Sequence, residues 1–357
     1  MKQFKLFLWI TSMVLYIQAQ AQTTGAPIPK ACPYDCCRPD GHAPLGIMTD
    51  HIHLKNQWAL SYTYMNSSFL GMRNGSTLAD DNTTFMDYAM SARRMNMDMH
   101  MFSLMYGLSS RLTLMGMVDY MSQNMTMDMN MESMHMHGSG SEATDMQMSA
   151  SGFSDTRIYA LYSLLDRCSH RLILHAALTL PTGSINRMGN TLLSDSGELS
   201  YGMQTGSGSW ALEPGLTYEA QRKHFSWGGV ASALCRLNTN TAGYRDGNIY
   251  SASAWLSWKW FHLLSSSLRV EATNTAAITG FDSRIQLLSA NDPMADARNS
   301  GNTRALCWLG TNFYKDRNPG RNLRLGIEYG IPFYERTTGL QPSLKGELLA
   351  GIQYLFN

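Results

Sequence analysis

The sequence predicts an all-β protein, a transmembrane antiparallel up-and-down β-barrel of about 12 strands with a short N-terminal periplasmic extension. Three observations predict this fold class. The chain begins with an export signal that no apolar helix follows, its hydrophobic stretches alternate with a period of two, and short connections between these stretches alternate with long ones. The barrel is expected over residues 56–357.

Residues 1–21 have the features of a secretory signal peptide. Lys2 and Lys5 accompany an apolar run over residues 4–17, and a small-x-small cleavage sequence follows at 19–21. No later stretch approaches about 18 uninterrupted apolar residues, so a helical membrane span is not expected. An exported chain with 15% charged residues, 17 tyrosines and 8 tryptophans can instead cross a membrane as a closed barrel.

Residues 22–55 form a Pro-rich segment that lacks strand alternation and is expected in the periplasm. It contains Cys32, Cys36, Cys37, His51 and His53. In an oxidising compartment a disulfide is the default for these cysteines. The more specific alternative is a soft-metal site that uses the thiols and the histidines.

The strands follow from residues that alternate in polarity. They are predicted near 58–65, 95–107, 111–121, 153–165, 169–180, 209–221, 224–238, 249–260, 263–276, 302–315, 321–333 and 344–356. The last strand ends on Tyr354 and Phe356, as the terminal strands of bacterial outer-membrane barrels do. Short connections such as 108–110 alternate with long ones such as 181–208, which places both termini in the periplasm. An edge strand of a soluble sandwich would show the same alternation as the last strand.

Methionine is concentrated in one part of the chain, since 18 of the 26 methionines lie between Met86 and Met148. A Met/His-rich extracellular loop is predicted over 122–152. The thioether is a soft ligand that suits Cu(I), and a nearby imidazole extends the range to Cu(II). The candidate ligands outside the N-terminal segment are Met97, Met99, Met101, Met105, Met115, Met117, Met125, Met127, Met129, Met131, Met134, His135, Met136 and His137. The alternatives are that the strand methionines fill the barrel interior and that the loop binds no ligand.

Strand parity divides the predicted barrel into two faces. Leu172, Leu174 and Leu178 are expected to face lipid, as are Leu325 and Ile327. Charged and imidazole side chains occupy the opposite parity, namely Arg157, His175, Glu213, Arg236, Arg269, Glu271, Arg304, Arg324 and Glu328. A charge that faces lipid at mid-bilayer costs several kcal/mol, so these groups are expected in the lumen. They either brace the barrel interior or guide a solute.

Four strings resemble a family of bacterial outer-membrane proteins. They are residues 43–53 (APLGIMTDHIH), 99–117 (MHMFSLMYGLSSRLTLMGM), 180–185 (LPTGSI) and 201–218 (YGMQTGSGSWALEPGLTY). The family is generally labelled as transporters or as phenol-degradation meta-pathway proteins, and the resemblance covers about residues 43–356. It implies an outer-membrane barrel that passes small, often hydrophobic compounds. The chain departs from the family by extending the methionine pattern into the predicted loop.

The sequence therefore leaves two main functions open for this protein, which is expected in a Gram-negative outer membrane. The first is binding or transport of soft metal ions, copper before others, through the Met/His-rich strand pair and loop. The alternative is a passive channel for small hydrophobic or aromatic compounds, and a third possibility is a purely structural barrel. No Ser/His or paired-carboxylate spacing points to an enzyme.

The expected partners follow from these two functions. They are outer-membrane lipid, a small-molecule or metal-ion solute and, for the metal function, a periplasmic metal-handling protein. No resident cofactor is expected, and copper would be a ligand. The net charge of +1 gives no sign of nucleic-acid binding.

Overall fold

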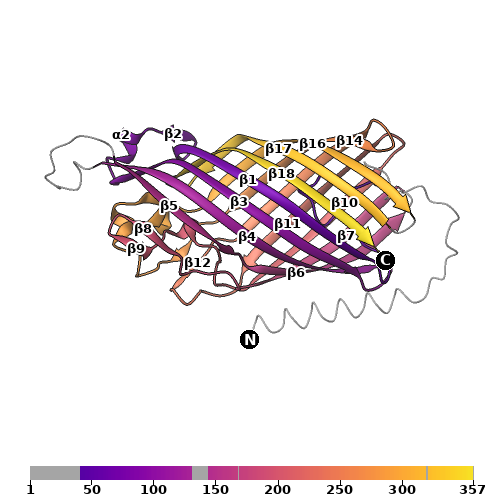
Figure 1. Cartoon of the computed structure of the whole chain (residues 1–357), viewed down its shortest axis with the longest axis horizontal. Coiled ribbons are helices and arrows are strands. Elements are labelled where there is room, and N and C mark those ends of the chain that lie inside the picture. Colours follow the sequence, from indigo (N-terminus) through magenta and orange to yellow (C-terminus); the bar gives the residue numbers. More distant parts are fainter. Residues whose placement is uncertain (1–40, 131–143, 168, 319–320, 357) are drawn as a thin grey trace. The chain divides into compact units, whose positions relative to one another are not determined.

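The computed structural model describes residues 41–130, 144–167, 169–318 and 321–356. Among these residues, no helix is both long enough and apolar enough to span a membrane. The described chain is almost entirely β-structure, and its strands run along the long axis of the view in Figure 1.

Twelve long antiparallel strands form a closed barrel within the described residues. They are β1 (Trp58–Asn74), β3 (Met90–Gly107), β4 (Leu112–Met129), β6 (Thr156–Arg167), β7 (His170–Leu180), β10 (Ala211–Gln221), β11 (Phe225–Arg236), β13 (Ile249–Lys259), β14 (Leu264–Thr275), β16 (Asn302–Asn318), β17 (Arg321–Thr337) and β18 (Leu340–Phe356). Each pairs with the strands before and after it in this series, and β18 pairs with β1 to close the barrel. The predicted fold class is confirmed.

Several strands are longer than the sequence pattern indicated, above all around the methionines. β4 continues to Met129, and β5 (Thr144–Phe153) pairs with its second half while β6 pairs with its first half. The predicted loop over 122–152 is therefore strand at both ends. The physical reason is that Met125 and Met127 alternate with polar residues at the two-residue period of a strand, and both thioethers are buried. Met131, Met134, His135, Met136 and His137 lie outside the described residues.

The two ends of the barrel differ in their connections. At one end, called the short-turn end here, tight turns join the strands, as between Gly107 and Leu112. The opposite, long-loop end carries small elements, several of which are labelled on the left of Figure 1. They are β2 (Thr77–Ala79), α2 (Asp81–Thr84), β8 (Met188–Thr191), β9 (Ser194–Glu198), η1 (Tyr201–Met203), β12 (Tyr244–Arg245), β15 (Thr279–Gly280), η2 (Leu288–Ala290), η3 (Pro293–Ala295) and η4 (Ala297–Asn299).

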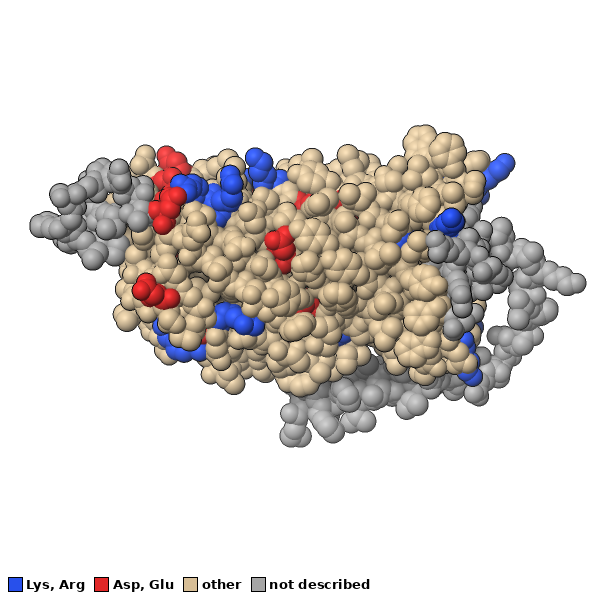
Figure 2. Space-filling model, viewed as in Figure 1, with Lys and Arg blue, Asp and Glu red and all other residues tan. Residues whose placement is uncertain are grey.

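The outer surface is apolar because successive side chains of a strand point to opposite faces of the sheet. On β7 the side chains of Leu174 and Leu178 are exposed, whereas Ile173 and Ala177 between them are buried. The exposed set continues around the barrel through residues such as Ile327 on β17. Figure 2 shows that one whole face carries few charged side chains. Such a surface suits contact with lipid chains.

Candidate functional site

Residues 41–57, called the lumen segment here, cross the inside of the barrel near the short-turn end. The backbone N–H of Gly46 donates to Glu328 on β17 at 2.9 Å, and that of His53 donates to Thr113 on β4 at 2.8 Å. The hydroxyl of Thr49 lies 3.0 Å from that of Thr217 on β10. The sequence predicts residues 22–55 as a periplasmic segment. Of its described part, residues 41–53 lie within the barrel, whereas Leu54 and Lys55 are exposed.

Local sequence explains why the segment fits there. A turn closes where the N–H of Ile47 donates to the carbonyl of Pro44 at 2.9 Å. The turn directs Ala43 and Ile47 against Trp255 of β13, and all three side chains are buried together. Burial of these apolar groups holds the segment against the inner wall of the barrel.

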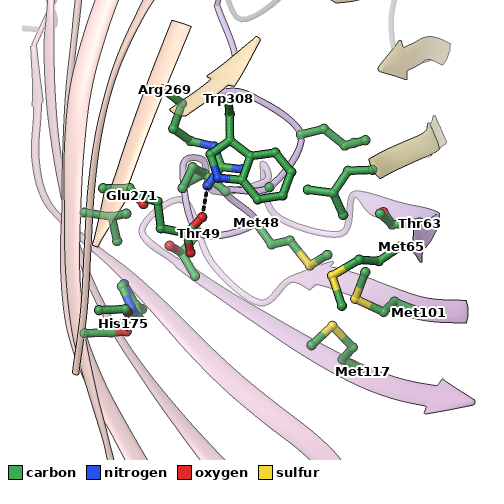
Figure 3. Close-up of a pocket in the computed structure, with 18 of the residues that line it drawn as sticks. Met48, Thr49, Thr63, Met65, Met101, Met117, His175, Arg269, Glu271 and Trp308 are labelled. Atoms are coloured by element: carbon green, nitrogen blue, oxygen red, sulfur yellow. Dashed lines mark hydrogen bonds and ion pairs between the residues drawn. The ribbon is translucent and has the colours of Figure 1, made fainter. Parts of the chain in front are cut away.

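A cavity of about 270 Å³ lies between the lumen segment and the barrel wall. Figure 3 shows two chemically different sides. The thioethers of Met48, Met65, Met101 and Met117 converge on one side, and the other side carries polar groups that include Arg269, Glu271 and His175. Met48 and Met65 were not among the predicted site residues, because each stands apart from the methionine-rich stretch in the sequence.

The charged side of the cavity is internally paired. Arg269 forms ion pairs with Glu328 at 3.0 Å and with Glu271 at 2.6 Å, and its guanidinium lies 4.3 Å from the ring centroid of Trp308. Arg157 pairs with Asp119 at 2.7 Å. These buried charges are therefore paired with one another inside the barrel.

The structure distributes the other predicted lumen residues along the barrel. Arg157, His175, Glu213, Arg269 and Glu271 line the cavity. Arg324 and Glu328 contact the lumen segment at Ala43 and Gly46. Towards the long-loop end, Arg304 pairs with Glu335 at 2.7 Å, and Arg236 lines a second cavity.

Methionines from neighbouring strands lie opposite one another in rows across the wall. The directly paired residues are Met65, Met99 and Met121; Met105 and Met115; Met95, Met125 and Met148; Met127 and Met146; and Met90 and Met129. Directly opposite residues have Cβ atoms about 4.5–5.5 Å apart, so neighbouring thioethers can touch. Of the remaining predicted ligands, Met97 lies opposite Gln123, and Met117 lies opposite both Ser103 and Arg157. We call this surface on β1, β3, β4 and β5 the methionine wall.

A second cavity of about 320 Å³ lies at the long-loop end. Leu340 lines it and also belongs to a buried apolar cluster that contains much of the methionine wall. The same cluster includes Met101 and Trp308, which line the first cavity. A continuous, methionine-rich apolar cluster therefore connects the two cavities.

Three imidazoles and a carboxylate gather where the lumen segment meets the short-turn end. The ring centroids of His42 and His51 are 4.7 Å apart, and those of His51 and His53 are 4.9 Å apart. Asp50 Oδ1 lies 2.6 Å from His51 Nδ1, and His53 Nε2 lies 3.3 Å from the sulfur of Met105. The predicted partners Cys32, Cys36 and Cys37 lie outside the described residues.

The environment sets the charge of this group. Burial lowers the pKa of His42 to about 4 and, with the nearby His51, lowers that of His53 to about 3. Burial acts to raise the pKa of Asp50, but His51 and His42 hold it well below its usual range. At neutral pH, Asp50 is therefore ionised, and His42 and His53 are neutral.

Comparison with known proteins gives one family and one fold. Residues 95–270 match the family model described as "Putative MetA-pathway of phenol degradation". A solved outer-membrane channel from Pseudomonas putida F1 superposes with a TM-score of 0.53 at 14% identity, over 87% of this chain and 97% of that chain. No match was found among curated proteins.

Two further solved structures are similar at lower scores. A Pseudomonas aeruginosa FadL homologue has a TM-score of 0.41 at 9% identity, over 94% of this chain and 96% of that chain. The CymD monoaromatic hydrocarbon channel has a TM-score of 0.36 at 8% identity, over 94% of each chain.

Proposed function

Because the chain belongs to this family of barrel proteins of the Gram-negative outer membrane, we propose that it is a passive channel for small hydrophobic molecules, aromatic compounds among them. The observation that carries the proposal is the buried apolar cluster that contains much of the methionine wall and includes residues that line both cavities. The phenol-degradation label of the family points to the same class of solute.

The dimensions and the chemistry of the first cavity support this solute class. An apolar cavity of about 150 Å³ holds benzene, so about 270 Å³ accommodates a single-ring aromatic molecule. Methionine side chains are flexible and polarizable, and they make favourable contacts with aromatic rings. The wall can therefore rearrange around a ring that moves between the cavities, without presenting a hydrogen-bonding group to it.

Uptake of radiolabelled toluene by porin-deficient Gram-negative cells tests the proposal, with arabinose as the polar comparison. Cells that carry the chain should take up toluene faster than cells without it, and arabinose uptake should not change. Met101→Glu places a charge in the methionine wall and should reduce toluene uptake by roughly tenfold or more, since burial of an unpaired charge costs well over 1.4 kcal/mol.

Leu287→Glu is the control, because Leu287 is 77% exposed in a loop. It should leave uptake unchanged, and heat-modifiable gel migration should show that both variants fold. Toluene uptake equal to that of cells without the chain, or equal gains for toluene and arabinose, would count against the proposed channel.

Passage of a soft metal ion, copper or silver, is the second candidate function. One specific contact favours it: His53 Nε2 lies against the sulfur of Met105, so the methionine rows end on an imidazole. Thioethers and imidazole together suit Cu(I), and weak repeated sites permit both entry and exit. A periplasmic metal-handling protein would then be the partner at the short-turn end.

A double variant, Met99→Leu with Met121→Leu, separates the two functions. Leucine conserves volume and apolar character but removes the sulfur ligands. A hydrophobic channel should keep its toluene uptake in this variant. A copper pathway should lose Cu(I) bound per refolded chain in titration, and unchanged Cu(I) binding would exclude this row as a site.

A further inference from the structure

The lumen segment brings together a set of potential metal ligands that is distinct from the methionine wall. His42, Asp50 and His51 each offer one ligand atom, and these atoms all lie within 4.8 Å of one another. All three side chains are buried. They are separated by up to nine positions in sequence, and the turn of the lumen segment places them side by side.

One buried nitrogen of the cluster lacks a hydrogen-bond partner among the described residues. His42 Nδ1 is buried without a hydrogen-bond partner among the described residues, although Asp50 Oδ2 lies 3.5 Å away. The same carboxylate oxygen accepts the N–H of Ala43 at 2.9 Å. Buried polar atoms are nearly always satisfied by protein, water or an ion, so His42 Nδ1 is open to an added ligand.

There is room for a small occupant beside these atoms. A void of about 30 Å³ is lined by His42, His51, His53, Tyr314, Arg324, Gln353 and Leu355, and Asp50 lines a second void of about 20 Å³ that shares His51, Arg324 and Gln353 with it. The larger void exceeds the roughly 10–15 Å³ that a cavity needs to hold one water, which is enough for a single ion. Gln353 Nε2 also lies 3.2 Å from His51 Nε2, so the barrel wall helps to orient that ring.

We propose that His42, Asp50 and His51 form a binding site for one transition-metal ion of borderline softness, Cu²⁺ or Zn²⁺. Two imidazoles and a carboxylate are a typical ligand set for these ions, and water or a protein carbonyl can complete the coordination. Arg324 contributes an opposing positive charge near the site through its contact with the Ala43 carbonyl. The negative charge of Asp50 makes a divalent cation favourable there despite that neighbour.

A bound ion would fix the conformation of the lumen segment itself. All three ligands come from this segment, so a bound ion closes a loop over residues 42–51 and fixes the turn at 44–47. The ion would hold the segment in its seated conformation, much as structural zinc stabilises small loops. This inference does not depend on which solute the barrel passes.

Metal titration of the refolded full-length chain in detergent, after treatment with a chelator, tests the proposal. Cu²⁺ and Zn²⁺ are added in separate arms. We expect His42→Gln and His51→Gln each to bind one ion fewer per chain than the parent, or to bind it at least ~100-fold more weakly, because loss of a direct ligand exceeds loss of a supporting hydrogen bond. His170→Gln, at the start of β7 on another part of the barrel, is the matched control and should bind as the parent does.

A second measurement does not depend on the folding of a variant. It is X-ray absorption at the zinc edge of the unmutated chain, loaded with one equivalent of Zn²⁺. A first shell of nitrogen and oxygen supports the site. A sulfur first shell would assign the ion to cysteine or methionine and overturn it. Equal binding by the parent, His42→Gln and His51→Gln would also overturn it, as would the absence of any tight site in the parent.

Discussion

Replacement of Arg269 by methionine tests whether ion pairs brace the barrel interior. The side chains of Arg269 and Glu328 are 2% and 1% exposed, and their charged atoms lie 3.0 Å apart. Arg269→Met keeps much of the side-chain volume but leaves the Glu328 carboxylate without its guanidinium. Removal of one partner from a buried pair costs roughly 3–5 kcal/mol. The lost contact with the Trp308 ring adds about 1 kcal/mol.

Equilibrium urea unfolding of the refolded chain in phospholipid vesicles, followed by tryptophan fluorescence, measures this loss. Arg298→Met is the matched control, because it likewise breaks a pair between an arginine and a carboxylate, Arg298 and Asp296. The side chain of Arg298 is 88% exposed, and exposed ion pairs contribute little to stability. The two variants therefore separate the effect of burial from the effect of removing an arginine.

A double variant identifies the cause of the loss. If the unpaired Glu328 carboxylate is responsible, Arg269→Met combined with Glu328→Gln should recover a large part of the stability that Arg269→Met loses, because the most deeply buried unpaired charge is then removed. The bracing role is refuted if Arg269→Met costs less than about 1 kcal/mol, or if the double variant is no more stable than Arg269→Met.

Three further predictions concern packing, docking and pH. Met127 is fully buried, so Met127→Ala should cost about 2–5 kcal/mol in the urea assay and Met127→Leu under about 1.5 kcal/mol, and equal costs would contradict tight packing of the methionine wall. A Cβ at Gly107 would lie 1.9 Å from the Leu54 carbonyl oxygen and would displace the end of the lumen segment. Gly107→Ala should therefore speed proteolysis of this segment without altering heat-modifiable migration of the barrel. An unchanged cleavage rate would contradict this contact. Burial raises the pKa of Asp292 to about 6 from 3.8, so between these values the folded chain holds a proton that the unfolded chain releases, and stability falls as pH rises. In a pH series of melting temperatures Asp292→Asn should remove this fall, which amounts to at most about 3 kcal/mol, and parallel curves for the two proteins would contradict it.

The barrel could be predicted from the sequence because each strand shows its own alternation of apolar and polar residues, which does not depend on distant parts of the chain. The alternation along residues 172–180 separates outward leucines from inward His175, and the structure places them so. The same alternation continues beyond residue 121, where the predicted strand ended and the observed β4 does not. Polar residues between Met125 and Met129 suggested a loop, yet polar side chains also suit a strand where it extends towards the long-loop end.

The candidate site could be predicted only in part, because it depends on contacts between distant residues. His51 and His53 stood out as a His-x-His pair, but nothing in the pattern joined them to His42 or placed them beside Met105. Residues 41–57 have no periodicity that would indicate a position inside a barrel. Met65 likewise joins Met101 only through the pairing of β1 with β3, and Met48 joins them only through the entry of the lumen segment.

The lumen segment links solute passage to the proposed metal site. Residues 45–49 line the first cavity on the side of the short-turn end, so a solute that leaves in that direction must displace them. These residues lie between the ligands His42 and Asp50, and a bound ion would hold them in place. We therefore expect saturating Zn²⁺ to slow toluene flux through the reconstituted chain and a chelator to restore it. The His42→Gln variant should conduct toluene at the same rate with and without Zn²⁺. Equal inhibition of the parent and this variant would place the zinc effect elsewhere, and a parent that binds Zn²⁺ with unchanged flux would show that the solute bypasses residues 45–49.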